Sequence, residues 1–185
     1  MLESITAKMN VEQLLDRCLE AFAEAGTLDL SLDQLATRVG ISKRMLLHYL
    51  RDRQSLEESV MTRLEEKLRA QFAPEMFPRS VSAKKVIMSL WDQTTAPESK
   101  GVLRLIMDIS RRAWSGSGRA KEFYREQQKL WVKLLLNYFP NEALIEELLH
   151  LFQGSTLVYL VTGDSRAGRR ALMRMLSRGR QSSKS

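Results

Sequence analysis

Cationic and hydroxyl side chains gather in one short stretch, Ser31–Leu56, which reads SLDQLATRVGISKRMLLHYLRDRQSL. Between Thr37 and Gln54, five basic residues stand against a single acidic one, Asp52. Lysine and arginine attract phosphate groups, and arginine can also form two hydrogen bonds to the edge of a guanine. The chemistry that this stretch favours is binding to a phosphate backbone and to base edges.

Two short helices must position these side chains. Ser31 predicts the start of the first helix, because Gln34 follows it at the spacing of a capping box. Gly40 stands where the chain must turn, and glycine adopts left-handed backbone angles easily. Ser42 predicts the start of the second helix. Since the apolar residues of each helix face the other, the sequence predicts a helix-turn-helix unit.

The second helix of such a unit lies in the major groove, with its first residues at the base edges. Lys43 and Arg44 are predicted to meet phosphates or guanines, and Met45 could touch a thymine methyl group. For His48, exposed packing and a phosphate contact both stay open. Tyr49 is expected to be half-buried, with its hydroxyl at the backbone and not at a base. The predicted DNA-binding residues are Ser31, Ser42, Lys43, Arg44, Met45, His48, Tyr49 and Arg53, the last as a phosphate anchor.

The residues expected of an enzyme are not grouped in this sequence. His48 and His150 are far apart, Cys18 is the single cysteine, and no metal-ligand spacing is present. There is no glycine-rich phosphate loop and no GxSxG motif. We therefore predict no enzymatic activity, no metal and no cofactor. Cys18 lies on an apolar stripe, so we expect a buried thiol, and one cysteine excludes an internal disulfide.

The whole chain reads as successive amphipathic helices, with 44% hydrophobic residues and only 9 Gly and 4 Pro in 185 residues. Asn10 and Asn141 are expected to begin helices, and Gly26 and Gly163 to end them. We predict an all-α fold of about nine helices, with an N-terminal three-helix DNA-binding domain and a C-terminal helical domain. The expected segments are a DNA-binding domain at 8–56 with its helix-turn-helix at 31–50, a connecting helix at 57–72, a helical domain at 78–178, and a disordered tail at 179–185.

The cellular location is predicted from what the chain lacks. The opening residues MLESITAKMN show no basic segment followed by an apolar run, so no signal peptide is expected. The longest uncharged run, FQGSTLVYLVTG, is shorter than the ~18–20 residues of a membrane span. We expect a bacterial cytoplasmic, nucleoid-associated protein without membrane contact.

The order of these elements resembles the TetR family of transcriptional regulators over about residues 10–68. The matching residues are Ser31, Leu35-Ala36, Gly40-Ile41-Ser42, Tyr49 and Arg53. Leu47 replaces a tyrosine that commonly contacts phosphate in the family, Leu50 replaces a phenylalanine, and Arg53 replaces a lysine. The remaining chain is similar only in its helix pattern.

The resemblance implies a ligand-responsive repressor that binds a near-palindromic operator in double-stranded DNA as a homodimer. It makes 78–178 the effector-binding and dimerisation domain, in which helices near Phe152–Gly163 and Ser165–Leu176 join the two copies. It also implies a cavity for an unidentified small-molecule effector, although core packing is the default expectation for most candidates. Those candidates are Met88, Trp91, Met107, Trp114, Phe123 and Trp131. Arg104, Arg111 and Arg112 could pair with an anion, although a solvated face is the default expectation. The alternative function is an all-helical adaptor that does not bind DNA.

Overall fold

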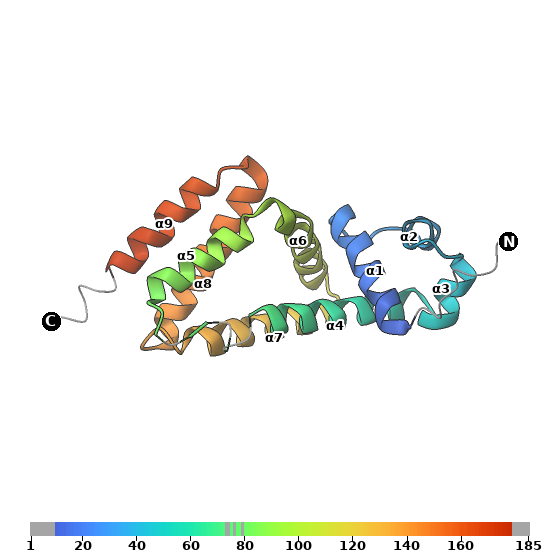
Figure 1. The fold of residues 1–185 in the computed structure, drawn as a ribbon, viewed down its shortest axis with the longest axis horizontal. Coiled ribbons are helices and arrows are strands. Elements are labelled where there is room, and N and C mark those ends of the chain that lie inside the picture. Colours follow the sequence, from blue (N-terminus) through green and yellow to red (C-terminus); the bar gives the residue numbers. More distant parts are fainter. Residues whose placement is uncertain (1–9, 73–74, 76, 79, 179–185) are drawn as a thin grey trace. The chain divides into compact units, whose positions relative to one another are not determined.

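A computed structural model describes residues 10–72, 75, 77, 78 and 80–178 of the chain. This part contains nine α-helices, one short 3-10 helix and no strand, which confirms the predicted all-α fold (Figure 1). The predictions for residues 8 and 9 and for the tail 179–185 lie outside the described residues. The elements are α1 (Val11–Ala25), α2 (Leu32–Val39), α3 (Lys43–Leu50), α4 (Arg53–Gln71), α5 (Ala83–Thr94), η2 (Pro97–Ser99), α6 (Lys100–Trp114), α7 (Gly118–Leu135), α8 (Glu142–Thr162) and α9 (Ser165–Arg178).

The helix ends follow the predicted capping residues. The Asn10 side chain accepts hydrogen bonds from the amides of Glu12 and Gln13, and Asn141 does the same for Leu144 at 2.9 Å. Gly26 and Gly163 end α1 and α8 in the left-handed region, with φ of 73° and 75°. Because these caps use neighbours in sequence, the local pattern alone was enough to predict them.

The chain folds as two compact units, and their division differs from the expected one. The first unit holds the described residues up to Leu68 together with Gly101–Tyr124, and the second holds those of Arg69–Lys100 and from Arg125 onward. The segment 78–178 is therefore not one domain, because α6 and the start of α7 pack with the N-terminal helices. An amphipathic pattern shows that a helix buries one face, but it does not identify the partner of that face.

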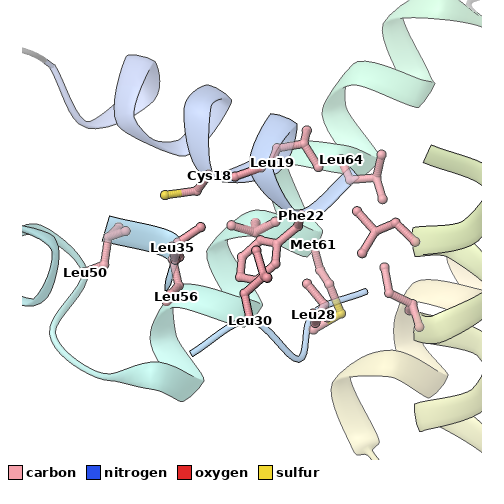
Figure 2. Close-up of a cluster of buried hydrophobic side chains, with 14 of the residues drawn as sticks. Cys18, Leu19, Phe22, Leu28, Leu30, Leu35, Leu50, Leu56, Met61 and Leu64 are labelled. Carbon is pink, nitrogen blue, oxygen red and sulfur yellow. The ribbon is translucent and has the colours of Figure 1, made fainter. Parts of the chain in front are cut away.

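The core of the first unit surrounds the ring of Phe22, as Figure 2 shows. Phe22 and Cys18 of α1 are fully buried, and Leu28 follows in the connection to α2. Each fully buried leucine or phenylalanine contributes about 1.5–3 kcal/mol of transfer free energy. This core holds α2 and α3 against α1 and α4. The other side chains labelled in Figure 2 are Leu19, Leu30, Leu35, Leu50, Leu56, Met61 and Leu64.

The second unit is organised around Trp91 of α5. Its indole Nε1 donates to the carbonyl oxygen of Ser165 at 3.1 Å, and its ring meets that of Phe152 edge-on at 5.3 Å. A side-chain carbon at Gly168 would lie 2.5 Å from the Trp91 ring, so glycine is needed there for α9 to pack this closely. Trp91 thereby joins α5, α8 and α9.

Candidate nucleic-acid interface

Helices α2 and α3 form the predicted helix-turn-helix unit. Gly40 has a φ of 80°, and its amide donates to the carbonyl oxygen of Ala36 at 2.9 Å. The amide of Ile41 donates to the same carbonyl at 3.0 Å. Leu35 of α2 and Leu46 of α3 are fully buried in the shared core. The turn is thus fixed by backbone hydrogen bonds, and each helix by its apolar face.

The start of α3 is exposed to solvent. Ser42 caps the helix by accepting from the amide of Met45 at 3.1 Å, and Ser42, Lys43, Arg44 and Met45 are all exposed. The amides of the first turn of a helix lack partners within the helix and carry a partial positive charge. The arrangement therefore combines free backbone donors with cationic side chains, which suits an anion.

Two of the exposed cations in this region are paired within the protein. The Lys43 ammonium lies 2.9 Å from the Asp33 carboxylate of α2, and Arg38 lies 3.7 Å from Glu24. Within the described part of the chain, Arg44 makes no side-chain hydrogen bond or ion pair. Of the two cations predicted to contact bases, Lys43 has a partner within the protein and Arg44 has none among the described residues.

Arg53 begins α4, as predicted, but its guanidinium is bonded within the protein. Its guanidinium donates to the carbonyl oxygens of Leu28 and Leu30 and to the carboxylate of Glu57, and it lies over the Phe22 ring at 5.9 Å. These bonds direct the guanidinium toward the connection between α1 and α2. Within this structure Arg53 is an internal clamp, a role that depends on a contact 25 residues distant in sequence, while its predicted phosphate contact stays a prediction.

The remaining predicted contact residues lie on or beside the same unit. Ser31 caps α2 by accepting from the Gln34 amide at 3.1 Å, and Gln34 accepts from the Ser31 amide at 2.8 Å. The Ser31 hydroxyl keeps its own proton for a further acceptor. His48 is exposed and meets the half-buried ring of Tyr49 edge-on at 5.4 Å.

Two residues of this surface escaped the sequence-based prediction. Arg51 caps the C-terminal end of α3, is exposed and has a φ of 61°. The excess of basic residues between Thr37 and Gln54 had already included it, so the signal was present in the sequence. Asp33 is the second, and its contact with Lys43 links residues ten positions apart on different helices.

The six predicted effector residues are divided between the two units. Met107, Trp114 and Phe123 belong to the first unit, and the others to the second. Phe123 is buried in the first core, while Trp114 is 89% exposed. The burial of Phe123 agrees with the core packing that was the default expectation, and effector binding by any of the six residues stays a prediction.

The first unit has a cleft of about 440 Å³ between α1 and α4. Its lining is polar and none of the six predicted effector residues contributes to it. The lining residues are Glu12, Leu15, Ser55, Glu58, Ser59, Thr62, Arg63 and Glu66.

Possible metal ligands are not clustered in the described part of the chain. A search of those residues finds no set of three His, Cys, Asp or Glu side chains that could hold a metal ion. Burial raises the pKa of the Cys18 thiol to about 12. The thiol is therefore protonated at neutral pH, which makes it a poor nucleophile.

In the part of the chain that the structure describes, α8 is long and apolar enough to cross a membrane by length and composition alone. It begins with Glu142, and further along it exposes Glu146, Glu147 and His150. Core helices of soluble proteins pass the same test, so this is weak evidence for a span.

Comparison with known proteins gives two similarities, while no family model matches the chain. A stretch of 57 residues is 40% identical to the HTH-type transcriptional regulator BetI of Escherichia coli O139:H28 (strain E24377A / ETEC), and equally to BetI of strain K12 / DH10B. This stretch is 31% of the chain and spans 29% of the length of BetI.

The fold has a solved counterpart. A TetR-family transcriptional regulator from Streptomyces coelicolor aligns with a TM-score of 0.69 at 18% identity, over 90% of this chain and 78% of the other. Both similarities agree with a helix-turn-helix unit followed by further helices. The chain therefore has the fold of the TetR-family transcriptional regulators.

Proposed function

We propose that the chain is a sequence-specific DNA-binding transcriptional regulator whose recognition helix is α3. The observation that carries the proposal is the exposed start of α3, where Lys43, Arg44 and Met45 stand on a helix fixed by its buried face. Arg44 can form two hydrogen bonds to a guanine, and Met45 can contact a thymine methyl group. The names of the relatives, which are transcriptional regulators, support the same function.

The proposed regulator works as a homodimer on a near-palindromic operator. Three apolar residues near the end of α8 are exposed, Leu157 at 54%, Val158 at 47% and Val161 at 77%. Burial of such a patch against a second copy removes it from water. Two recognition helices related by a two-fold axis would then meet half-sites about 34–36 Å apart, or a multiple of that distance.

The decisive test of DNA binding is a mobility shift with an operator selected from random duplexes. The variant Lys43→Ala/Arg44→Ala should lose operator binding while it remains folded. Lys84 and Lys85 are also neighbouring and exposed, at the start of α5, so Lys84→Ala/Lys85→Ala is the matched control and should bind normally. Equal affinity of the two double variants would remove the assignment.

Salt dependence separates this function from that of an adaptor protein. Each phosphate contact releases counterions, so operator affinity should fall about 10³-fold or more between 50 mM and 200 mM salt if six or more phosphates are bound. An adaptor that does not bind DNA would show no measurable affinity for the operator at either salt concentration.

The dimer is tested by sedimentation of Leu157→Glu/Val161→Glu, which should be monomeric. Leu136 at 45% exposure lies just beyond α7, and Leu136→Glu should remain dimeric. If both variants sediment as the wild type does, the α8 patch is not the interface.

The proposed regulator acts as a repressor that an unidentified small molecule releases from DNA. The effector must bind the DNA-free conformation more tightly than the DNA-binding one. Equal affinity for both would not shift the equilibrium between them. Within the second unit, Trp131 is half-buried and packs on Phe72 with ring centroids 4.6 Å apart. Trp131 is therefore the candidate residue for contact with the effector. Effector binding should quench or shift tryptophan emission, and Trp131→Leu should abolish that change.

A further inference from the structure

One face of α6 follows the end of α1 and the connection to α2. A side-chain carbon at Gly101 would lie 2.5 Å from the carbonyl oxygen of Ala23, so glycine is needed for this approach. One turn later, Nη2 of Arg104 donates to the carbonyl oxygen of Glu24 at 3.0 Å. Positions three and four apart share a helix face, and the next position on this face is Asp108.

The Asp108 carboxylate holds the connection directly. Its Oδ2 accepts from the backbone amide of Leu28 at 3.0 Å and from the Thr27 hydroxyl at 3.1 Å. The side chain is only 9% exposed. The carbonyl oxygen of Leu28 in turn accepts from Arg53 of α4. Both backbone polar groups of Leu28 are thus bound by charged side chains, one from α6 and one from α4.

Charged residues around this connection form a balanced network. Arg112 lies 3.2 Å from Asp108, 3.1 Å from Glu57 and 2.6 Å from Asp29. Arg111 bonds Asp108 at 2.8 Å. Desolvation opposes ionisation of Asp108, but the bonds from the Leu28 amide and from Arg111, Arg112 and Thr27 outweigh it and lower its pKa. The three cations are Arg53, Arg111 and Arg112, and the three anions are Asp29, Glu57 and Asp108.

We infer that Asp108 is a positioning residue for the recognition helix. It fixes the Leu28 amide, three residues before the Ser31 cap that begins α2, and α2 carries α3 through their shared core. The inference rests on the proposed DNA-binding function, because an orientation of α3 matters only if α3 reads DNA. It adds α6 as a support of the helix-turn-helix unit, which the sequence had assigned to the other domain.

Two substitutions at Asp108 separate charge from hydrogen bonding. Asp108→Asn keeps an oxygen that can accept from the Leu28 amide but loses the ion pairs with Arg111 and Arg112. Asp108→Ala loses both and leaves the buried amide without an acceptor. Because a bond to a charged acceptor is stronger than one to a neutral acceptor, Asn should have the intermediate effect.

The test measures two quantities in the full chain. Hydrogen exchange of the Leu28 amide, followed by NMR in the absence of DNA, should be slowest in the wild type, faster in Asp108→Asn and fastest in Asp108→Ala. The Kd for the selected operator should rise about threefold in Asp108→Asn and about tenfold in Asp108→Ala, in the same order. If Asp108→Ala does not fold, the exchange rate and the Kd of Asp108→Asn and Arg112→Gln are compared with those of the wild type instead.

The matched control is Asp92→Ala, which removes an exposed carboxylate paired with Arg169 in the second unit. It should change neither quantity. The inference is overturned if Asp108→Asn leaves Leu28 exchange unchanged, if it speeds exchange but keeps the operator Kd within twofold, or if Asp92→Ala weakens binding equally. If the wild type binds no DNA, the proposed function is wrong. The exchange rates of the Leu28 amide would still show whether Asp108 holds the connection between α1 and α2.

Discussion

The Nζ atom of Lys43 lies 2.9 Å from Oδ2 of Asp33, which ties the first residue of α3 to the first turn of α2. Both side chains are exposed, at 48% and 72%. An exposed ion pair contributes little to stability, about 0–1 kcal/mol. Its larger effect is on binding, because Asp33 competes with phosphate for the same ammonium group.

Removal of that competitor should strengthen contact with any duplex. We expect Asp33→Asn to raise affinity for non-operator DNA several-fold and to steepen the plot of log K against log salt by about 0.9, the value for one additional phosphate contact. Fluorescence anisotropy across a salt series measures both. Glu147→Gln on α8 removes an equal charge from the second unit and should leave the slope unchanged. A slope that Asp33→Asn does not alter would mean that Lys43 stays away from phosphate.

Arg53 gives a test that distinguishes an internal clamp from a phosphate anchor. Lysine would serve a phosphate nearly as well, but it cannot donate along the three directions that the carbonyls of Leu28 and Leu30 and the Glu57 carboxylate occupy. We expect Arg53→Lys to lower the free energy of unfolding by about 2–3 kcal/mol, since bonds from a charged donor are lost. Urea denaturation measures the change. Unaltered stability combined with weaker operator binding would restore the anchor role.

Asp16 predicts how stability depends on pH. Bonds from Arg63 at 2.8 and 3.0 Å, together with Lys67 at 2.9 Å, hold the pKa of Asp16 far below its usual range against the opposing effect of desolvation. Because the folded pKa is the lower one, the stabilisation is fully present above the unfolded pKa of about 3.9 and is lost as the pH falls toward the folded value.

The matching variant is Asp16→Asn, which should lower the Tm by about 2–4 °C at pH 7. The difference from the wild type should narrow below about pH 4, because the Asp16 carboxyl of the unfolded chain then takes up a proton while that of the folded chain stays ionised. Calorimetry at several pH values checks this. A difference that is the same at pH 3 and pH 7 would show that the ion pair is not its source.

Gly101 tests the close approach of α6 to α1. Gly101→Ala places a methyl group 2.5 Å from the Ala23 carbonyl oxygen, so the helices must separate. We expect a loss of about 1–3 kcal/mol, the usual cost of overpacking. Gly118→Ala begins α7 in open space and should be neutral or stabilising. Equal unfolding midpoints for the two variants would mean that α6 can shift without cost.

The sequence was sufficient for the features that depend on neighbouring residues. Ser31, Gly40 and Ser42 delimit the helix-turn-helix because caps and turns bond groups within five positions of each other. The exposed face of α3 was predicted from the same spacing. Leu46 and Tyr49 were expected to face inward, and Leu46 is buried and Tyr49 half-buried.

Contacts between distant parts of the chain were beyond the sequence pattern. Arg112 reads as a surface cation, yet it is 20% exposed and its shortest ion pair is with Asp29, 83 positions away. Asp108 meets the Leu28 amide at a separation of 80 residues. Hydrophobic periodicity shows that one face of a helix is buried. Which other element buries that face depends on the packing of the whole unit. The assignment of α6 to the wrong domain has the same cause.

The equal number of cations and anions around Leu28 also restricts how this region can change over evolutionary time. Loss of Asp29 or Glu57 alone would leave an excess of positive charge among these six side chains, and loss of Arg112 would leave an excess of negative charge. Among homologous chains, these positions should therefore vary in compensating pairs. Correlated substitution of Asp29, Glu57 and Arg112 among homologues would indicate that α6 supports the helix-turn-helix in those proteins as well.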